Sequence, residues 1–233
     1  MERRCIFIKK RQITYDEFLS YTQIKPGLVH IHQGLIYKHS PNSLEIVSAI
    51  EETKANPVFR YISTPKSILM IEDFYFGYTS KFRTDLHIVE DAEYLRIVKD
   101  INDFIWKLLH IIEELNKLNF YYWDYHQNNI FSDLRGDPFI IDIDDMNTSY
   151  SELNLYHQAK YLTEYLLNLL FSQEKPIQKY AKSEILEKYL STESMNYIRS
   201  LLKRTGANTN LPYILIEELS NPYKREVIKS KIK

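Results

Sequence analysis

The sequence predicts an α+β fold with two lobes, a small β-rich N-terminal lobe followed by a mostly helical C-terminal lobe. Two observations lead to this class. Short apolar or alternating runs, which are typical of strands, dominate residues 1–82, and apolar residues then recur at spacings of three and four through most of residues 83–233. We therefore expect a single bilobal domain with its hinge near residues 78–90.

The N-terminal part is expected to hold a hairpin, a helix and three further strands. Apolar runs at 28–33 and 35–39 flank Gly34, which suits a hairpin turn. A helix is expected at about 43–54, with a serine as its N-cap, and Asn56-Pro57 stops it. Three more apolar runs predict strands, namely FRYI (59–62), SILMIEDF (67–74) and YFGYTSKF (75–82).

The C-terminal part is expected to be helical apart from one stretch. From Asp91 to Leu118 the apolar positions follow helical spacing, which predicts one long helix or two consecutive ones. The same spacing predicts later helices at 151–171, about 175–190 and about 193–204, with a short pair at the C-terminus. The exception lies between these helical segments and carries most of the chemistry.

Composition excludes several classes of function. The 233 residues are 44% hydrophobic and carry a formal net charge of -1, so neither a nucleic-acid partner nor an anionic membrane is expected. No apolar run approaches the ~18 residues of a membrane span, and the N-terminus lacks the pattern of a signal peptide. The lone Cys5 excludes an internal disulfide and a cysteine metal cluster. We expect a cytoplasmic protein.

The stretch YYWDYHQNNIFSDLRGDPFIIDIDD, residues 121–145, places six aspartates beside what should be core. Buried carboxylates are costly unless they are paired, hydrogen-bonded or bound to a metal. Asp133 and Asp137 lie where a turn and solvent account for them. The other aspartates need a different explanation.

The second half of this stretch predicts a hairpin. Two short strands within 130–143 flank a turn that Gly136 allows, and such a hairpin brings Asp142 near Asn129. Asp124 lies on the preceding loop. An acid, an amide and a second acid then converge, which suits oxygen ligation of Mg²⁺ together with a separate base.

The loop WDYHQNNI resembles the catalytic loop of the protein-kinase-like superfamily. It is closest to the G-D-x-H-x-x-N-I form found in aminoglycoside and choline kinases and in compact bacterial kinases. Asp124, His126, Asn129 and Ile130 match this form, and Trp123 stands in place of its Gly. The resemblance implies a bilobal protein-kinase-like fold.

The run FIIDID resembles the strand that ends in the metal-binding D-F-G of the same family, with Asp142 in the Asp position and Asp144 in place of the Gly. The resemblance implies that Asn129 and Asp142 hold Mg²⁺, or Mn²⁺ as the alternative ion, against the phosphates of ATP. It implies that Asp124 orients the acceptor hydroxyl or accepts its proton, and that His126 holds the loop in shape. Asp144 is then a supporting group or an additional metal ligand.

The family also requires a lysine that contacts the α- and β-phosphates and a helical glutamate that holds it. Lys38, on the predicted strand LIYKH, resembles that lysine. Glu45 is its expected partner, with Glu51 and Glu52 as the alternatives farther along the same helix.

The run FYFGYTSKF resembles the gatekeeper strand and hinge of the family. The backbone from Thr79 through Lys81 to Phe82 would then meet the adenine ring, and Asp85 follows at a place suited to the ribose. The aromatic side chains in this run are assigned to packing.

The sequence departs from the family in two places. It has no G-x-G-x-x-G, so coverage of the phosphates falls to an atypical turn around Gly27. After the predicted catalytic loop (122–130) and metal-binding hairpin (130–145), only eight residues separate Asp145 from Asn154, which replaces the usual anchoring Asp. No A-P-E motif follows.

The sequence therefore predicts an ATP- and Mg²⁺-dependent kinase that moves the γ-phosphate to a hydroxyl acceptor, either a protein Ser/Thr or a small molecule. Two alternatives keep the fold. A pseudokinase that acts as an interaction module would account for the missing glycine-rich loop. Nucleotidyl transfer would use the same acids with ATP bound in the flipped orientation.

Overall fold

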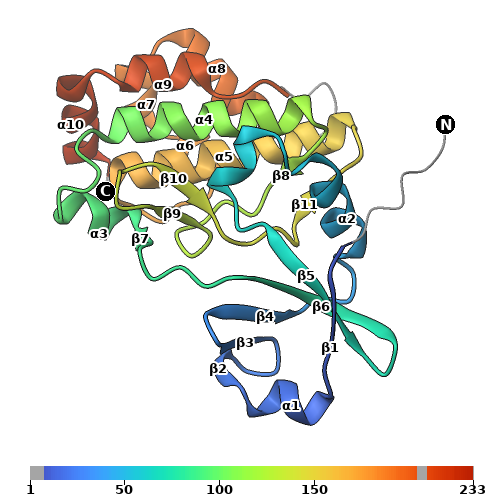
Figure 1. Cartoon of the computed structure of the whole chain (residues 1–233). Helices are drawn as coiled ribbons and strands as arrows, with labels where there is room; N and C mark the ends of the chain where they lie inside the picture. Colours follow the sequence, from blue (N-terminus) through green and yellow to red (C-terminus); the bar gives the residue numbers. More distant parts are fainter. Residues whose placement is uncertain (1–7, 204–208, 233) are drawn as a thin grey trace. The chain divides into compact units, whose positions relative to one another are not determined.

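The computed structural model describes residues 8–203 and 209–232, whose helices and strands are labelled in Figure 1. These residues divide into two compact units. One unit comprises the described residues of Met1–Phe120 together with Gln127–Thr148, and the other comprises Tyr121–His126 together with the described residues of Ser149–Lys233. The predicted lobes, 1–82 and 83–233, divide the chain differently and stay a prediction. Cys5, the N-terminal segment before residue 8 and the predicted helix end near Gly206 lie outside the described residues.

The first unit contains a six-stranded sheet in the order β1-β5-β6-β4-β3-β2. Its only parallel pair is β1 with β5, and the other neighbours are antiparallel. Figure 1 shows β6 between β5 and β4. The strands are β1 (Lys10–Gln12), β2 (Thr22–Lys25), β3 (Val29–His32), β4 (Leu35–His39), β5 (Pro65–Ile71) and β6 (Phe74–Lys81).

Two tight turns fix the register of this sheet. Gln33 and Gly34 both have positive φ between β3 and β4, and Glu72 and Asp73 both have positive φ between β5 and β6. Two consecutive residues of positive φ are typical of the hairpin turn that matches strand twist. The hairpin predicted around Gly34 is confirmed, and the predicted strands at 67–74 and 75–82 are confirmed with their boundary moved to the second turn.

Two helices bury apolar side chains in this unit. Phe18 of α1 (Tyr15–Ser20) is fully buried and joins a core cluster with Tyr37 of β4 and Leu69 of β5. The predicted helix at 43–54 is confirmed as α2 (Leu44–Thr53), which contacts β5 and β6 and buries Ile46, Val47 and Ile50. This helix follows β4 directly and so ties the strand that carries Lys38 to the core.

The strand predicted at 59–62 is wrong. Residues Pro57–Tyr61 form a 3₁₀ helix, η1, and the side chain of Asn56 caps it by accepting a hydrogen bond from the Val58 N–H (3.0 Å). Proline at the first helical position already has the required φ, and the asparagine cap satisfies a free donor, so this local signal outweighs the apolar composition.

The rest of the first unit surrounds the acidic hairpin. The hairpin strands form a three-stranded sheet in the order β10-β9-β7. The helical run from Asp91 is two helices rather than one, because Arg96 adopts a positive φ of 58° between them and Asp100 caps the second helix. The elements are β7 (His87–Ile88), α3 (Val89–Tyr94), α4 (Ile101–Lys117), β9 (Ile130–Ser132), β10 (Pro138–Ile140) and β11 (Met146–Asn147).

The second unit is helical apart from the strand β8 (Tyr121–Tyr122) and its loops. Its longest helix, α5 (Glu152–Phe171), buries twelve residues and is capped by Ser151 at the N–H of Asn154 (3.0 Å). The later helices are α6 (Ile177–Ala181), α7 (Glu184–Tyr189), α8 (Thr192–Ser200), α9 (Tyr213–Leu219) and α10 (Pro222–Lys231). The predicted helix at 151–171 is confirmed, and the one predicted at about 175–190 is two short helices.

The predicted α+β class is confirmed, with most of the sheet in the N-terminal third and most of the helix after residue 100. Within the described ranges, no helix combines the length and apolarity that a membrane crossing requires.

Candidate active site

Lys38 of β4 lies at the centre of a polar cluster in the first unit. Its ammonium is 2.6 Å from Oδ1 of Asp142 and 2.9 Å from Oδ2 of Asp144, and its side chain is 17% exposed. Asp144 also accepts hydrogen bonds from the hydroxyls of Ser40 (2.7 Å) and Tyr78 (2.9 Å). Two carboxylates that are 104 and 106 residues away in sequence therefore share one ammonium.

The sheet explains why these side chains meet. Lys38 and Tyr78 are directly opposite each other in the antiparallel pair of β4 and β6. Opposite residues in such a pair project from the same face of the sheet. The pairing is close because Gly77, which faces His39, has no side chain.

The positive charge of Lys38 and the negative charges of Asp142 and Asp144 stabilise one another. Burial alone would lower the pKa of the Lys38 ammonium, but Asp142 and Asp144 raise it above its ordinary value. Because the folded-state pKa is raised, this contribution to stability is present at neutral pH and is lost only as the pH rises through that pKa. Complete burial, and next the negative charge of Asp144, raise the pKa of Tyr78 well above its ordinary value, so its hydroxyl stays protonated and donates to Asp144.

The hairpin places the backbone next to Asp142 against Asn129. Ile130 pairs with Ile140 across β9 and β10, and the N–H of Ile141 donates to the carbonyl of Asn129 (3.0 Å). Asp142 directly follows Ile141, the residue that makes this backbone hydrogen bond to Asn129. Asn129 is only 5% exposed.

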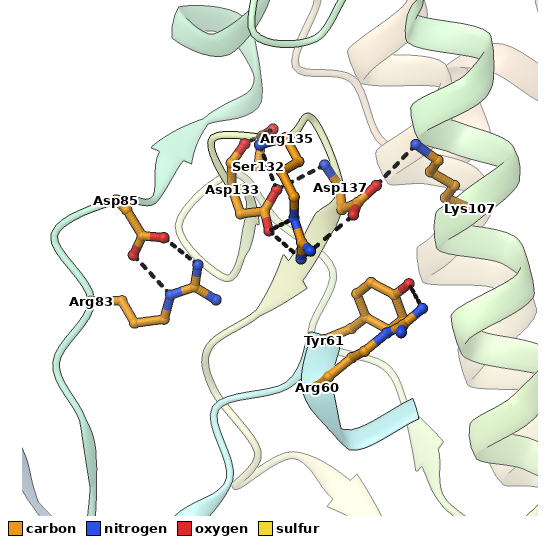
Figure 2. A network of polar contacts seen from close by, with 9 residues as sticks. All are labelled: Arg60, Tyr61, Arg83, Asp85, Lys107, Ser132, Asp133, Arg135 and Asp137. Atoms are coloured by element: carbon orange, nitrogen blue, oxygen red, sulfur yellow. Dashed lines mark hydrogen bonds and ion pairs between the residues drawn. The ribbon is translucent and has the colours of Figure 1, made fainter. Parts of the chain in front are cut away.

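The turn of the hairpin is organised by Asp133 (Figure 2). Its Oδ1 accepts hydrogen bonds from the N–H groups of Arg135 (2.9 Å) and Asp137 (3.1 Å), and its Oδ2 accepts from the Arg135 guanidinium. Gly136 has a φ of 81°, and Asp137 pairs with Lys107 of α4 at 2.9 Å. The assignment of Asp133 to the turn is correct, although its carboxylate is buried rather than in solvent.

Replacing Asp133 with Ala should destabilise the first unit by about 2–3 kcal/mol, because two backbone donors then lose their acceptor, a side chain that is only 7% exposed. Chemical denaturation followed by fluorescence measures this loss. Arg135→Gln is the control, since the Arg135 side chain is 73% exposed and should change stability little. Equal stabilities for the two variants would show that the backbone bonds to Asp133 do not hold the turn.

The part of the predicted catalytic loop that lies in the second unit, residues 122–126, is ordered by its own aromatic residues. The Tyr122 hydroxyl donates to the carbonyl of Asp124 (2.9 Å), and the rings of Tyr122 and Tyr125 pack edge to face with their centroids 5.0 Å apart. Nε2 of His126 lies 3.3 Å from Oδ2 of Asp124. A contact of this kind suits the loop-shaping role that the resemblance implies for His126.

The structure does not bring Glu45 to Lys38. Oε1 of Glu45 accepts a hydrogen bond from the hydroxyl of Thr148 (2.8 Å), and the acidic partners of Lys38 are Asp142 and Asp144 instead.

In the second unit, Asn154 in the first turn of α5 anchors the short segment that precedes this helix. Its side chain donates a hydrogen bond to the carbonyl of Ser149 (2.7 Å).

The predicted hinge residues have other contacts. The Thr79 hydroxyl is buried and hydrogen-bonded to Ser67 (2.7 Å), and the N–H of Phe82 donates to the carbonyl of Gly34 (3.0 Å). That N–H is therefore not free to meet adenine. Lys81, Phe82 and Asp85 line a cavity whose walls include neither Lys38 nor Asp142.

One carboxylate oxygen of this cluster is available to a cation. Oδ1 of Asp142 accepts from the Lys38 ammonium and from the N–H of Asp144 (3.1 Å), whereas its Oδ2 has no hydrogen bond among the described residues. A carboxylate oxygen that no donor engages is a ligand of the kind that Mg²⁺ prefers. Across residues 8–203 and 209–232, no group of three His, Cys, Asp or Glu side chains is arranged to hold a metal.

Sequence reasoning missed Ser40 and Tyr78. Tyr78 was assigned to a strand whose aromatic residues serve packing, and Ser40 precedes the predicted helix. Both donate to Asp144, and the signal that could have found Tyr78 is the strand register that places it opposite Lys38. That register cannot be derived from a single sequence without knowing which strands are neighbours.

Neither a protein-family model nor a curated protein matches the sequence. Among solved structures, the chain is similar to the LegK7 effector kinase of Legionella pneumophila, with 13% identity and a TM-score of 0.49 over 88% of this chain and 60% of that chain. It is also similar to the ROP18 kinase domain in complex with AMP-PNP and sucrose, with 11% identity and a TM-score of 0.47 over 84% of this chain and 73% of that chain. This chain thus spans about 60% of the length of the LegK7 chain.

Proposed function

We propose that this protein is an ATP- and Mg²⁺-dependent phosphotransferase of the protein-kinase-like superfamily. The observation that carries the proposal is the pair of short contacts between Lys38 and the two carboxylates that follow the hairpin, Asp142 and Asp144. A lysine on the strand before a helix, an asparagine before the hairpin and an aspartate after it are the parts that this chemistry requires. The short segment before Asn154 favours a compact kinase without a peptide-binding platform.

Each group has a role in the proposal. Lys38 binds the α- and β-phosphates, which compete with Asp142 and Asp144 for its ammonium. Asp142 and Asn129 would hold Mg²⁺, with Mn²⁺ as the alternative ion, which would supply positive charge against the negative charge that develops on the phosphates. Asp144 holds Lys38 in place, and both of its oxygens already accept hydrogen bonds from protein donors.

The transfer step follows from these roles. Asp124 orients the acceptor hydroxyl and takes its proton as the oxygen bonds to the γ-phosphorus. The bond from that phosphorus to the β,γ-bridging oxygen breaks, and ADP leaves with the electron pair. His126 keeps the Asp124 carboxylate in place.

The proposal includes two further contacts of the nucleotide. Adenine meets the backbone between Thr79 and Phe82 through groups other than the Phe82 N–H, which bonds Gly34. The turn at Gly27, where φ is 66° and no atom lies within 4 Å of a built Cβ, has room for the phosphates to approach the backbone. The acceptor is a hydroxyl of a protein Ser/Thr or of a small molecule.

Labelled ATP tests the proposal. The full-length protein is incubated with Mg²⁺ and ATP labelled at the γ-phosphate, alone, with a Ser/Thr-rich protein and with small alcohols. We expect label in an acceptor or in the protein itself, and stabilisation by ATP in thermal unfolding. Absence of both would refute the proposal.

Two further measurements separate the alternatives, one with ATP labelled at the α-phosphate and one of partner binding. Nucleotidyl transfer would move label from the α-phosphate instead. A pseudokinase would bind its partner equally well when Asp124 and Asp142 are both replaced by Ala, and the absence of a glycine-rich loop is the feature that favours it. Loss of partner binding in that double variant would count against the pseudokinase.

A further inference from the structure

A cavity of about 490 Å³ in the first unit is lined by none of the side chains to which the proposed transfer reaction assigns phosphate, metal or proton chemistry. It is lined by η1 and the residues that follow it, by the start of β5, by the segment at the end of β6 and by Phe139 of β10. Its lining includes none of the residues of the Lys38 cluster. Its volume is in the range of small-molecule sites, which is roughly 300–1,000 Å³.

The lining of this cavity is strongly cationic. Arg60, Lys66, Lys81 and Arg83 contribute four positive charges, and Asp85 contributes a single negative one. In the part of the chain that the structure describes, Lys66 and Lys81 form no ion pair and Arg60 bonds only the Tyr61 hydroxyl. Positive charges that lie close together repel one another, and a bound anion reduces that repulsion.

Contacts with Asp85 and Phe139 fix the orientation of the Arg83 guanidinium. Its Nε donates to Oδ1 of Asp85 at 2.8 Å, a second N–H donates to Oδ2, and the guanidinium lies over the ring of Phe139 at 4.5 Å from the centroid. Figure 2 shows this pair on the segment after β6 and Arg60 with Tyr61 at η1. A guanidinium has five donors, so the remaining three are unused within the described residues.

Asp85 orients Arg83 without neutralising the cavity. The pKa of the Asp85 carboxyl is lowered to about 2, chiefly by the hydrogen bonds from Arg83 and in smaller part by Lys81. The carboxylate is therefore charged at every physiological pH, and the other three cations still have no counter-charge on the cavity wall.

Three hydroxyls add neutral donors to the same wall. Ser63, Thr64 and Thr84 line the cavity, and their hydroxyls have no hydrogen bond to other described residues. Phosphate oxygens accept from hydroxyls as well as from Arg and Lys, and planar guanidinium groups match them in two-point contacts. Phe59 and Phe139 supply an apolar surface beside these donors.

We propose that this cavity binds a small phosphate monoester, with its dianion among Arg60, Lys66, Lys81 and Arg83 and its organic part against Phe59 and Phe139. A small molecule is favoured by the cavity volume, and a phosphate by the number of cations and donors. The cavity shares Lys81 and Phe82 with the segment proposed to meet adenine, but its lining includes neither Lys38 nor Asp142, and the proposed binding does not depend on phosphoryl transfer.

Titration with phenyl phosphate tests the proposal on the full-length chain at constant ionic strength, by ³¹P line broadening. We expect saturable binding that weakens about tenfold in Lys66→Gln and further in Arg60→Gln/Lys66→Gln, since each change removes a charge-assisted contact. Lys99 is an exposed lysine outside the cavity and provides the control. The Lys99→Gln variant should bind phenyl phosphate within about twofold of the unchanged protein, because a distant exposed charge contributes little.

Lys38→Ala separates the two sites. Phenyl phosphate binding that survives Lys38→Ala and is lost in the Arg60/Lys66 variant supports the cavity. Binding that Lys38→Ala abolishes and Lys66→Gln spares would overturn the proposal, as would an absence of saturation or an equal loss in Lys99→Gln. Circular dichroism of each variant confirms that a loss of binding is not a loss of fold.

Discussion

If the protein is the proposed phosphotransferase, replacing Asp142 with Asn will strongly lower the rate of phosphoryl transfer and leave the protein folded. The change removes the charged oxygen that is not engaged by any donor in the described residues, while Asn can still accept from Lys38 and from the N–H of Asp144. Loss of a metal ligand removes several kcal/mol of transition-state stabilisation, and we therefore expect a rate decrease of roughly 10³-fold. The Asp142 side chain is 30% exposed, so the loss of stability should be only about 1 kcal/mol.

Asp144→Asn is the matched control, because Asp144 binds the same ammonium from two residues away. Both Asp144 oxygens already accept hydrogen bonds, from Ser40 and from the buried Tyr78. This variant should lose stability by about 1–3 kcal/mol and keep its rate within about tenfold. Transfer of labelled γ-phosphate and denaturant unfolding measure the two effects. If Asp144→Asn lowers the rate as much as Asp142→Asn, then Asp144 is itself a metal ligand.

The candidate site was predictable where its residues are close in sequence. Asn129 and Asp142 are joined by a tight hairpin, and the glycine of its turn, Gly136, has the positive φ that the sequence implies. Lys38 was found from its place on a strand that precedes a helix. Its partners were not, because the choice between Glu45 and the aspartates depends on contacts across more than 100 residues.

The fold shows the same limit in a different form. Periodicity is local, so it predicted α5 almost to the residue and the hairpin at Gly34. The error at 59–62 arose where an apolar run follows Asn56-Pro57, whose capping and fixed φ start a 3₁₀ helix. Strand order is non-local, and nothing in the sequence places β6 between β5 and β4.

Replacing Gly77 with Ala will strongly destabilise the sheet around Lys38. A Cβ built at Gly77 lies 1.9 Å from the carbonyl oxygen of Lys38 and 2.8 Å from the nitrogen of Ser40. Both atoms belong to the backbone of the neighbouring strand, which can move only by breaking its pairing with β6. Overpacking typically costs 1–3 kcal/mol and more where the structure cannot yield, so we expect at least about 3 kcal/mol. The melting temperature of a chain this size should fall by roughly 6–12 °C.

Gly34→Ala is the control for this prediction. Gly34 has a φ of 75°, but no atom lies within 4 Å of its built Cβ, so Ala there suffers only backbone strain of about 1–2 kcal/mol. Gly77 differs in both respects. Its φ does not lie in the left-handed region, and backbone atoms of Lys38 and Ser40 occupy the space that a Cβ would need. Comparable melting temperatures for the two variants would contradict the close approach of β4 and β6. A larger loss in Gly77→Ala, together with loss of ATP stabilisation, would show that the strand contact at Gly77 is what places Lys38 beside Asp142.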